Sequence, residues 1–109
     1  RDRSVSRGLG DVYKRQAILR AFAYPADLVL LDEPFHNLDV ALKYKIMDEL
    51  SALLRENEST AVLVTHTAEE ALYLADEIAV MDGGKIAARF PNDDRAGERL
   101  LSILRGERA

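Results

Sequence analysis

Apolar residues recur along the chain either at helical spacing or as short continuous runs, and the two patterns alternate. Helical spacing with start and stop signals predicts helices over residues 14–24, 39–56, about 67–75 and about 94–105. The continuous apolar runs predict strands over residues 27–31, 60–65, 77–81 and 85–90. The pattern is that of a mixed α/β chain.

The first two predicted strands are joined by the long helix over 39–56, and this order implies that the strands pair in parallel. Both strands are apolar without alternation, which is typical of strands buried on both faces of a sheet. Asp82-Gly83-Gly84 predicts a tight turn, so the last two strands form a hairpin. The predicted fold class is α/β, with a parallel sheet flanked by helices and a carboxy-terminal β-hairpin and helix.

Two polar residues occupy expected helix N-cap positions. Asp39 precedes the long helix, and Thr67 precedes the short helix with Glu70 three residues later, which is the arrangement of a capping box. We expect each of the two capping side chains to accept a hydrogen bond from the first turn of its helix.

Composition narrows the possible classes of function. The chain has 109 residues, 48% of them apolar and 31% charged, which is the balance of one globular domain. Its formal net charge of −4 argues against binding nucleic acid by bulk electrostatics. No apolar run approaches the ~20 residues of a membrane span. The absence of cysteine excludes disulfides and thiolate metal sites.

Two adjacent carboxylates, Asp32 and Glu33, follow the first predicted strand and precede Pro34. In an open parallel sheet, ligands bind at the carboxyl ends of the strands. Two acids at that edge can divide the work, because one can hold a hydrated Mg²⁺ while the other orients or deprotonates an attacking water. The alternative interpretation is a polar strand end that enters a turn.

His66 follows the second predicted strand and is expected at the same edge of the sheet as Asp32 and Glu33. An imidazole there can donate a hydrogen bond to a phosphate oxygen. The alternative is a structural histidine, just as Asp39 has the alternative of being a helix cap only.

These motifs together resemble the ATP-binding cassette (ABC) ATPases, and most closely the importer subunits of the nitrate, sulfonate and taurine group. The resemblance covers about Ala17 to Phe90 and rests on four segments: the run 31–39 with Asp32-Glu33-Pro34 and Leu38-Asp39, Val62-Leu63-Val64-Thr65-His66, Glu69-Glu70-Ala71-Leu72 and Ala75-Asp76-Glu77-Ile78. It implies an incomplete P-loop NTPase (RecA-like) sheet, with ATP and Mg²⁺ as cofactors.

The resemblance also implies roles for individual residues. Asp32 is similar to the Walker B aspartate, which acts on Mg²⁺ through water, and Glu33 is similar to the catalytic base. His66 resembles the switch histidine that touches the γ-phosphate, and Asp39 resembles the nucleotide-contacting aspartate of the D-loop. Phosphoryl transfer depends mainly on positioning and charge neutralisation, so a few polar side chains on a rigid sheet suffice.

The chain departs from the family pattern in two important places. It contains no Gly-x-x-x-x-Gly-Lys-Ser/Thr phosphate-binding loop (Walker A). Where the signature motif is expected, the chain reads Gly8-Leu9-Gly10-Asp11-Val12. Thr67 and His36-Asn37 are smaller departures beside the switch histidine and in the D-loop. Residues 17–109 therefore resemble the carboxy-terminal part of a nucleotide-binding domain, and we expect this part alone to be inactive.

The first sixteen residues lack helical or alternating order, which indicates a foreign or disordered lead. Asp11-Val12-Tyr13-Lys14-Arg15-Gln16 is compatible, codon by codon, with a transposon end used in preparing sequencing libraries. The hypothesis is that residues 1–16 are translated adapter and that the genuine protein sequence begins near Ala17.

For the intact parent, the resemblance implies an ATPase subunit of an importer. Its expected partners are a second ATPase subunit in a head-to-tail dimer, transmembrane permease subunits and, indirectly, an extracytoplasmic solute-binding protein, with no nucleic acid. Its expected location is cytoplasmic, peripheral on the inner face of the cell membrane. The alternatives are a non-transport ABC ATPase that works on ribosomes or DNA, and a short partner-binding module that hydrolyses nothing.

The resemblance also carries an expectation about stability. In the family, the strand that bears the phosphate-binding loop lies between the strand before His66 and the strand over 77–81. Its absence leaves interior strand edges unpaired, and each buried unpaired backbone group costs about 1–3 kcal/mol. We therefore expect the isolated chain to be marginally stable and prone to aggregation.

Overall fold

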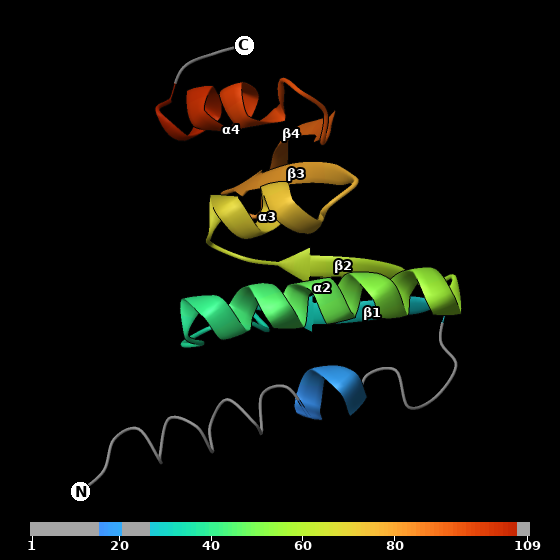
Figure 1. Ribbon diagram of the computed structural model, residues 1–109. Helices are drawn as coiled ribbons and strands as arrows, with labels where there is room; N and C mark the ends of the chain where they lie inside the picture. Colours follow the sequence, from blue (N-terminus) through green and yellow to red (C-terminus); the bar gives the residue numbers. More distant parts are fainter. Residues whose placement is uncertain (1–15, 21–26, 107–109) are drawn as a thin grey trace, which may run out of the picture. The chain divides into compact units, whose positions relative to one another are not determined.

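The computed structural model describes residues 16–20 and 27–106 (Figure 1). The chain divides into two compact units, one ending at Thr65 and the other beginning at His66. Of the helix predicted over 14–24, residues 16–20 are helical, and the remainder lies outside the described residues. The predicted foreign lead also lies outside them, apart from Gln16.

The first unit contains a parallel strand pair joined by a long helix. Strand β1 spans Leu28–Asp32, helix α2 spans Val40–Asn57 and strand β2 spans Thr60–Val64. The register runs from Leu28 opposite Thr60 to Asp32 opposite Val64, so the predicted parallel pairing is confirmed. All three elements agree with the predicted ranges to within one residue at each end.

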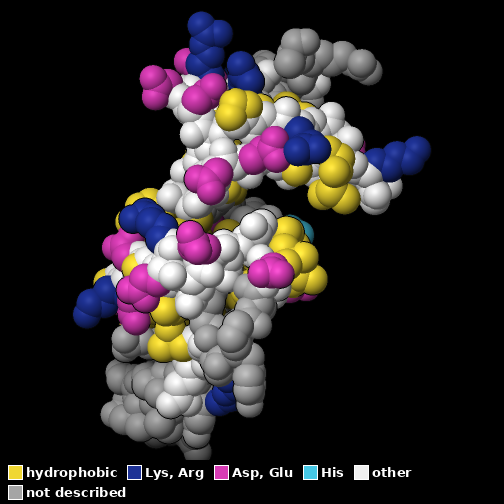
Figure 2. All heavy atoms as spheres, turned by 90° about the vertical axis from the view of Figure 1, so that its right-hand side faces the viewer, with side chains coloured by type: hydrophobic (Ala, Val, Ile, Leu, Met, Phe, Trp, Pro, Cys, Tyr) yellow, Lys and Arg dark blue, Asp and Glu magenta, His cyan; other side chains and the backbone are white. Residues whose placement is uncertain are grey.

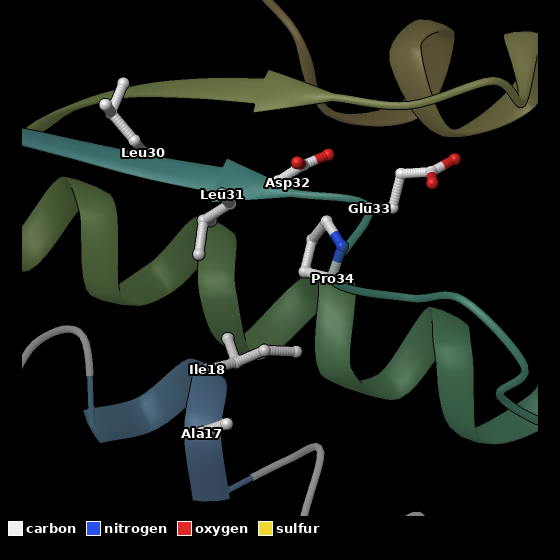
Figure 3. Close-up of a pocket in the computed structure, with 7 residues that line it drawn as sticks. All are labelled: Ala17, Ile18, Leu30, Leu31, Asp32, Glu33 and Pro34. Carbon is white, nitrogen blue, oxygen red and sulfur yellow. The ribbon is translucent and has the colours of Figure 1, made fainter.

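β1 is buried on one face only, and β2 is partly buried on the same face, so the prediction of burial on both faces is wrong. Val29 and Leu31 are buried, and Figure 3 shows Leu31 on the side of β1 that faces α2. The opposite face, here called the open face, exposes four aliphatic side chains: Leu28 (54% exposed), Leu30 (71%), Val62 (48%) and Val64 (51%). An apolar run therefore predicted the strands correctly but not how many layers cover them.

Packing in the first unit centres on the inner face of α2. The buried side chains of the first unit include Ile18 from the helical segment 16–20, Val29 and Leu31 from β1, Phe35 from the following turn, and Ile46, Met47 and Leu50 from α2. Ile46 and Met47 are the largest fully buried side chains among the described residues. The buried residues of α2 thus lie on one face of the helix, as its apolar periodicity predicted.

The N-cap residues of the two helices were predicted at the correct positions, but the capping hydrogen bonds expected of their side chains are not made. Asp39 and Thr67 are the N-cap residues of α2 and of helix α3 (Ala68–Leu74), and both have extended backbone. Neither side chain makes a capping hydrogen bond; instead, the Asp39 carbonyl accepts from Lys43 N–H at 2.8 Å, and the Thr67 carbonyl from Glu70 N–H at 3.1 Å. Position follows from the backbone bend, whereas a capping bond also needs a suitable side-chain rotamer.

The second unit is a hairpin with helices before and after it. Strands β3 (Glu77–Asp82) and β4 (Lys85–Pro91) are antiparallel, and helix α4 spans Ala96–Leu104. Gly83 and Gly84 make the turn with φ of 58° and 78°, values that glycine adopts without steric cost. A register irregularity lies between Val80 and Met81. The predicted hairpin and terminal helix are confirmed.

A closed apolar cluster holds the second unit together. Its buried members are Ile78, Phe90, Ala96 and Leu100, and partly buried residues of α3, β3, β4 and α4 pack against them. The other face of the hairpin is exposed and mixed in character: Arg89 Nη2 lies 2.8 Å from Glu77 Oε1, and the hairpin also exposes Met81 (61%) and Ile86 (56%). The strands of this unit therefore alternate between a packed and a solvated face, as antiparallel strands commonly do.

Within the described residues, β2 pairs with β1 and β3 pairs with β4, in two separate two-stranded sheets. The chain is thus a small α/β protein with one parallel and one antiparallel pair. None of the helices in this part of the chain is long and apolar enough to cross a bilayer. Apolar, acidic and basic side chains are interspersed over the face drawn in Figure 2.

Candidate functional site

Asp32 and Glu33 leave the sheet at the carboxyl end of β1. Asp32 is the last residue of the strand and is exposed, and Glu33 follows it half-buried. Glu33 N–H donates to the Val64 carbonyl at 2.7 Å, which extends the parallel ladder beyond the last strand pair. The two carboxylates therefore stand on a backbone that is hydrogen-bonded to the neighbouring strand, at the edge where parallel sheets bind ligands.

The backbone at Glu33 adopts the left-handed region, with φ of 46°. This conformation is uncommon for a residue other than glycine and costs on the order of 1–3 kcal/mol, and such residues cluster at functional sites. The following turn is held by His36 N–H to the Glu33 carbonyl and by Leu38 N–H to the Phe35 carbonyl, each at 3.2 Å. Phe35, only 2% exposed, anchors this turn in the core of the first unit.

A pocket of about 380 Å³ lies beside the carboxyl end of β1. Its lining comes from the segment 16–20 and from β1 with its turn: Ala17, Ile18, Leu30, Leu31, Asp32, Glu33 and Pro34. Figure 3 shows Leu31 extending toward Ile18, while the carboxylates of Asp32 and Glu33 lie on the other side of the strand. The apolar side chains of the lining and the two carboxylates thus lie on different sides of the end of β1.

The donor set at this strand end fits Mg²⁺ only in part. Carboxylate oxygens are the ligands this ion prefers, and it commonly binds through one or two of them while keeping several waters and substrate phosphates. Within residues 16–20 and 27–106, no group of three or more His, Cys, Asp or Glu side chains could hold a metal ion. A magnesium ion bound through Asp32 would therefore have to take most of its ligands from water and a nucleotide.

Asp39 and His66 lie at the start of helices. Asp39 is exposed directly before α2, after a turn in which Asn37 also has a positive φ, of 63°. His66 opens the second unit and immediately precedes Thr67, the N-cap of α3. Asp32, Glu33 and Asp39 belong to the first unit and His66 to the second, so the meeting of His66 with the two acids stays a prediction.

Two features of the site were not predicted from the sequence. The left-handed backbone at Glu33 has no sequence signal, because glutamate does not favour that conformation as glycine or asparagine does. The contribution of Ala17 and Ile18 to the pocket was not predicted either, because the helical spacing over 14–24 indicated a helix there but no binding site.

No protein-family model matches the chain. Curated proteins do match it. An aliphatic sulfonates import ATP-binding protein of Paraburkholderia xenovorans is 40% identical over 87% of the chain and 38% of its own length. A thiamine import ATP-binding protein of Brucella abortus is 39% identical, over 90% of the chain and 42% of its own length. An Fe(3+) ions import ATP-binding protein of Haemophilus influenzae is 41% identical, over 78% of the chain and 24% of its own length.

The chain spans less than half the length of these relatives. The sulfonate subunit agrees with the importer group that the sequence resembled, and the thiamine and iron subunits match to a similar degree. All three are named as import ATP-binding proteins, and the resemblance stated from the motifs alone points to the same family. Over most of its own length, the chain is related to the ATP-binding subunits of ABC importers.

Proposed function

We propose that residues 17–109 are the carboxy-terminal part of a P-loop NTPase domain in an importer subunit that binds and hydrolyses ATP. The observation that carries this proposal is the end of β1, where Asp32 and Glu33 project from a parallel ladder that continues through Glu33 N–H to Val64. The relationship to importer ATP-binding subunits supports it. The proposal concerns the full-length protein.

Each of the four site residues has a distinct task in the proposed reaction. Asp32 holds the water shell of a magnesium ion, which neutralises charge on the β- and γ-phosphates when bound. Glu33 orients the attacking water and accepts its proton. His66 donates a hydrogen bond to a γ-phosphate oxygen, where negative charge gathers during transfer. Asp39 contacts the nucleotide from the D-loop.

The left-handed backbone at Glu33 supports the assignment of the base. The bond to Val64 and the Phe35 turn hold the backbone of Glu33, so the point from which its side chain projects is set before the nucleotide arrives. Preorganised groups of this kind need little rearrangement at the moment of reaction. The strain is consistent with a chemical role for Glu33.

The relationship to importer ATP-binding subunits supports the proposed assembly. Without a phosphate-binding loop in its sequence, the 109-residue chain alone hydrolyses no ATP. The full-length subunit pairs head to tail with a second ATPase subunit and drives permease subunits from the cytoplasmic side of the membrane, and a solute-binding protein delivers the solute to the permease. The relatives differ in the solute that their names give, so the solute class is left open.

The experiment is the substitution Glu33→Gln in the full-length protein. We expect ATP binding to persist and steady-state hydrolysis to fall by about 10²-fold or more, which is the scale of losing a positioned base. Glu58→Gln is the matched control, because Glu58 is also a glutamate with positive φ, at the C-cap of α2, and it should leave hydrolysis unchanged. Full hydrolysis by Glu33→Gln would remove Glu33 from the role of base.

A further inference from the structure

Helix α3 carries His66 at its amino-terminal end and has only seven residues. Isolated helices of two turns are unstable in water, because nucleation is costly and few hydrogen bonds follow it. The position of α3, and of His66 with it, therefore depends on contacts that the helix makes with the rest of its unit, including those at its carboxy-terminal end.

Apolar packing partly buries α3 and by itself restrains its axial position weakly. The residues of α3 and its C-cap that pack against the core of the second unit are Ala68, Ala71, Leu72 and Ala75. Three of these four are alanine, whose small side chain interdigitates little with neighbouring side chains. Because the hydrophobic effect is non-directional, such a contact is satisfied over a range of small displacements along the helix axis.

Asn92 supplies directional contacts to the carboxy-terminal end of α3. Its Nδ2 donates to the Leu72 carbonyl at 2.8 Å and to the Ala75 carbonyl at 2.7 Å, both at the carboxy-terminal end of α3. Its backbone N–H donates to the Asp76 carbonyl at 2.9 Å. One partly buried amide thus uses both of its hydrogens on carbonyls at the end of the helix, which a helix leaves without internal partners.

We propose that Asn92 is a positioning residue for His66, acting through α3. The helix is short enough that its two ends move together, and the Thr67 carbonyl accepts from Glu70 N–H, so the hydrogen-bonded turn begins one residue after His66. Fixing Leu72 and Ala75 along the helix axis therefore fixes the backbone from which the imidazole projects. The inference rests on the proposed function, in which His66 meets the γ-phosphate.

The test is a double-mutant cycle in the full-length protein, with kcat and KM for ATP measured separately. The variants are Asn92→Ala, His66→Ala and the two combined, with retention of fold checked by circular dichroism. Asn57→Ala is the matched control, because Asn57 Nδ2 likewise donates to a helix carbonyl, Leu53 O at 2.9 Å, but on α2 of the first unit. It should leave both constants unchanged.

We expect His66→Ala to lower kcat by about 10²-fold and Asn92→Ala to lower it by about tenfold, with KM within about twofold, because misplacement of a catalytic group is costly. Adding Asn92→Ala to His66→Ala should cause no further loss, since residues acting as one unit are non-additive. A full additional loss would overturn the positioning role and leave the role of His66 intact. Undiminished kcat in His66→Ala would overturn the proposed role of His66, and the positioning role with it.

A spectroscopic measurement on the 109-residue chain tests the same link without ATP. The chain has two histidines, so His36 in the first unit is an internal reference for the imidazole resonances of His66. Asn92→Ala should shift the His66 resonances and leave those of His36 unchanged. If the His66 resonances keep their positions in a folded Asn92→Ala chain, the proposal is wrong.

Discussion

The two units of the chain cover their sheets in different ways. In the first unit, the parallel strands β1 and β2 bury one apolar face and expose the open face of Leu28, Leu30, Val62 and Val64. In the second unit, the antiparallel hairpin packs its apolar side on a closed cluster and turns the Glu77–Arg89 ion pair to solvent.

The difference follows from what each type of sheet tolerates. Antiparallel pairs commonly present one polar face to water, whereas parallel sheets are covered on both faces. The second unit meets this requirement in part, because its hairpin places the Glu77–Arg89 ion pair on the face exposed to water. The first unit has apolar side chains on both faces of its strands, which fits a sheet that receives a further layer in proteins more than twice as long as this chain.

The largest expected effect tests whether the second unit has a closed core. Phe90 is 5% exposed, so Phe90→Ala should destabilise the unit by about 3–5 kcal/mol through lost burial and a residual cavity. Hydrogen exchange of the amides in β3, β4 and α4 measures this cost. Exchange at the original rate would show that the cluster does not hold the unit together.

A second pair of variants compares the two faces of β1. In the 109-residue chain, Leu31→Ala should cost about 2–5 kcal/mol, whereas Leu30→Ala, at a residue 71% exposed, should change stability by less than about 0.5 kcal/mol. In the full-length protein we expect Leu30→Ala to approach the cost of Leu31→Ala. Urea denaturation of both proteins provides the measurement, and a neutral Leu30→Ala in the longer protein would contradict a covering layer.

The smallest expected effect concerns the Glu77–Arg89 ion pair on the exposed face of the hairpin. Arg89 and Glu77 are 61% and 54% exposed, so Arg89→Ala should cost less than about 1 kcal/mol. Salt screens exposed charges, so the difference from the parent chain should shrink further at high ionic strength. Arg89 lies next to Phe90 on the opposite face of β4, which makes it the control for Phe90→Ala. A loss comparable to that of Phe90→Ala would contradict the assignment of faces.

Element type and order were predictable because each depends on local pattern. The apolar spacing of α2 and the runs of β1 and β2 predicted those elements to within one residue at each end. The exposure of Leu28 and Leu30 was not predictable, because an apolar run indicates a strand suited to burial on both faces and carries no information on which layers are present. The unmade caps at Asp39 and Thr67 depend on side-chain rotamers, which sequence does not specify.

The placement of the two acids in the candidate site was predictable from the sequence, whereas the chemical roles of the site residues stay predictions. Adjacent acids at a strand end indicated Asp32 and Glu33, and the parallel register with its extra bond to Val64 confirms that both leave the sheet at that edge. The convergence with His66 stays a prediction. The role of Asn92 could not be predicted from a motif. It depends on hydrogen bonds to the carbonyls of Leu72 and Ala75, which are distant in sequence.

The left-handed backbone of Glu33 sets stability and chemistry against each other at a single position. Glycine or asparagine would adopt a φ of 46° at lower cost, so selection for thermal robustness alone favours those residues. Neither carries a carboxylate, so neither could act as the base proposed for Glu33. Under that proposal, a more heat-resistant version of the protein should leave position 33 untouched and seek its gains elsewhere.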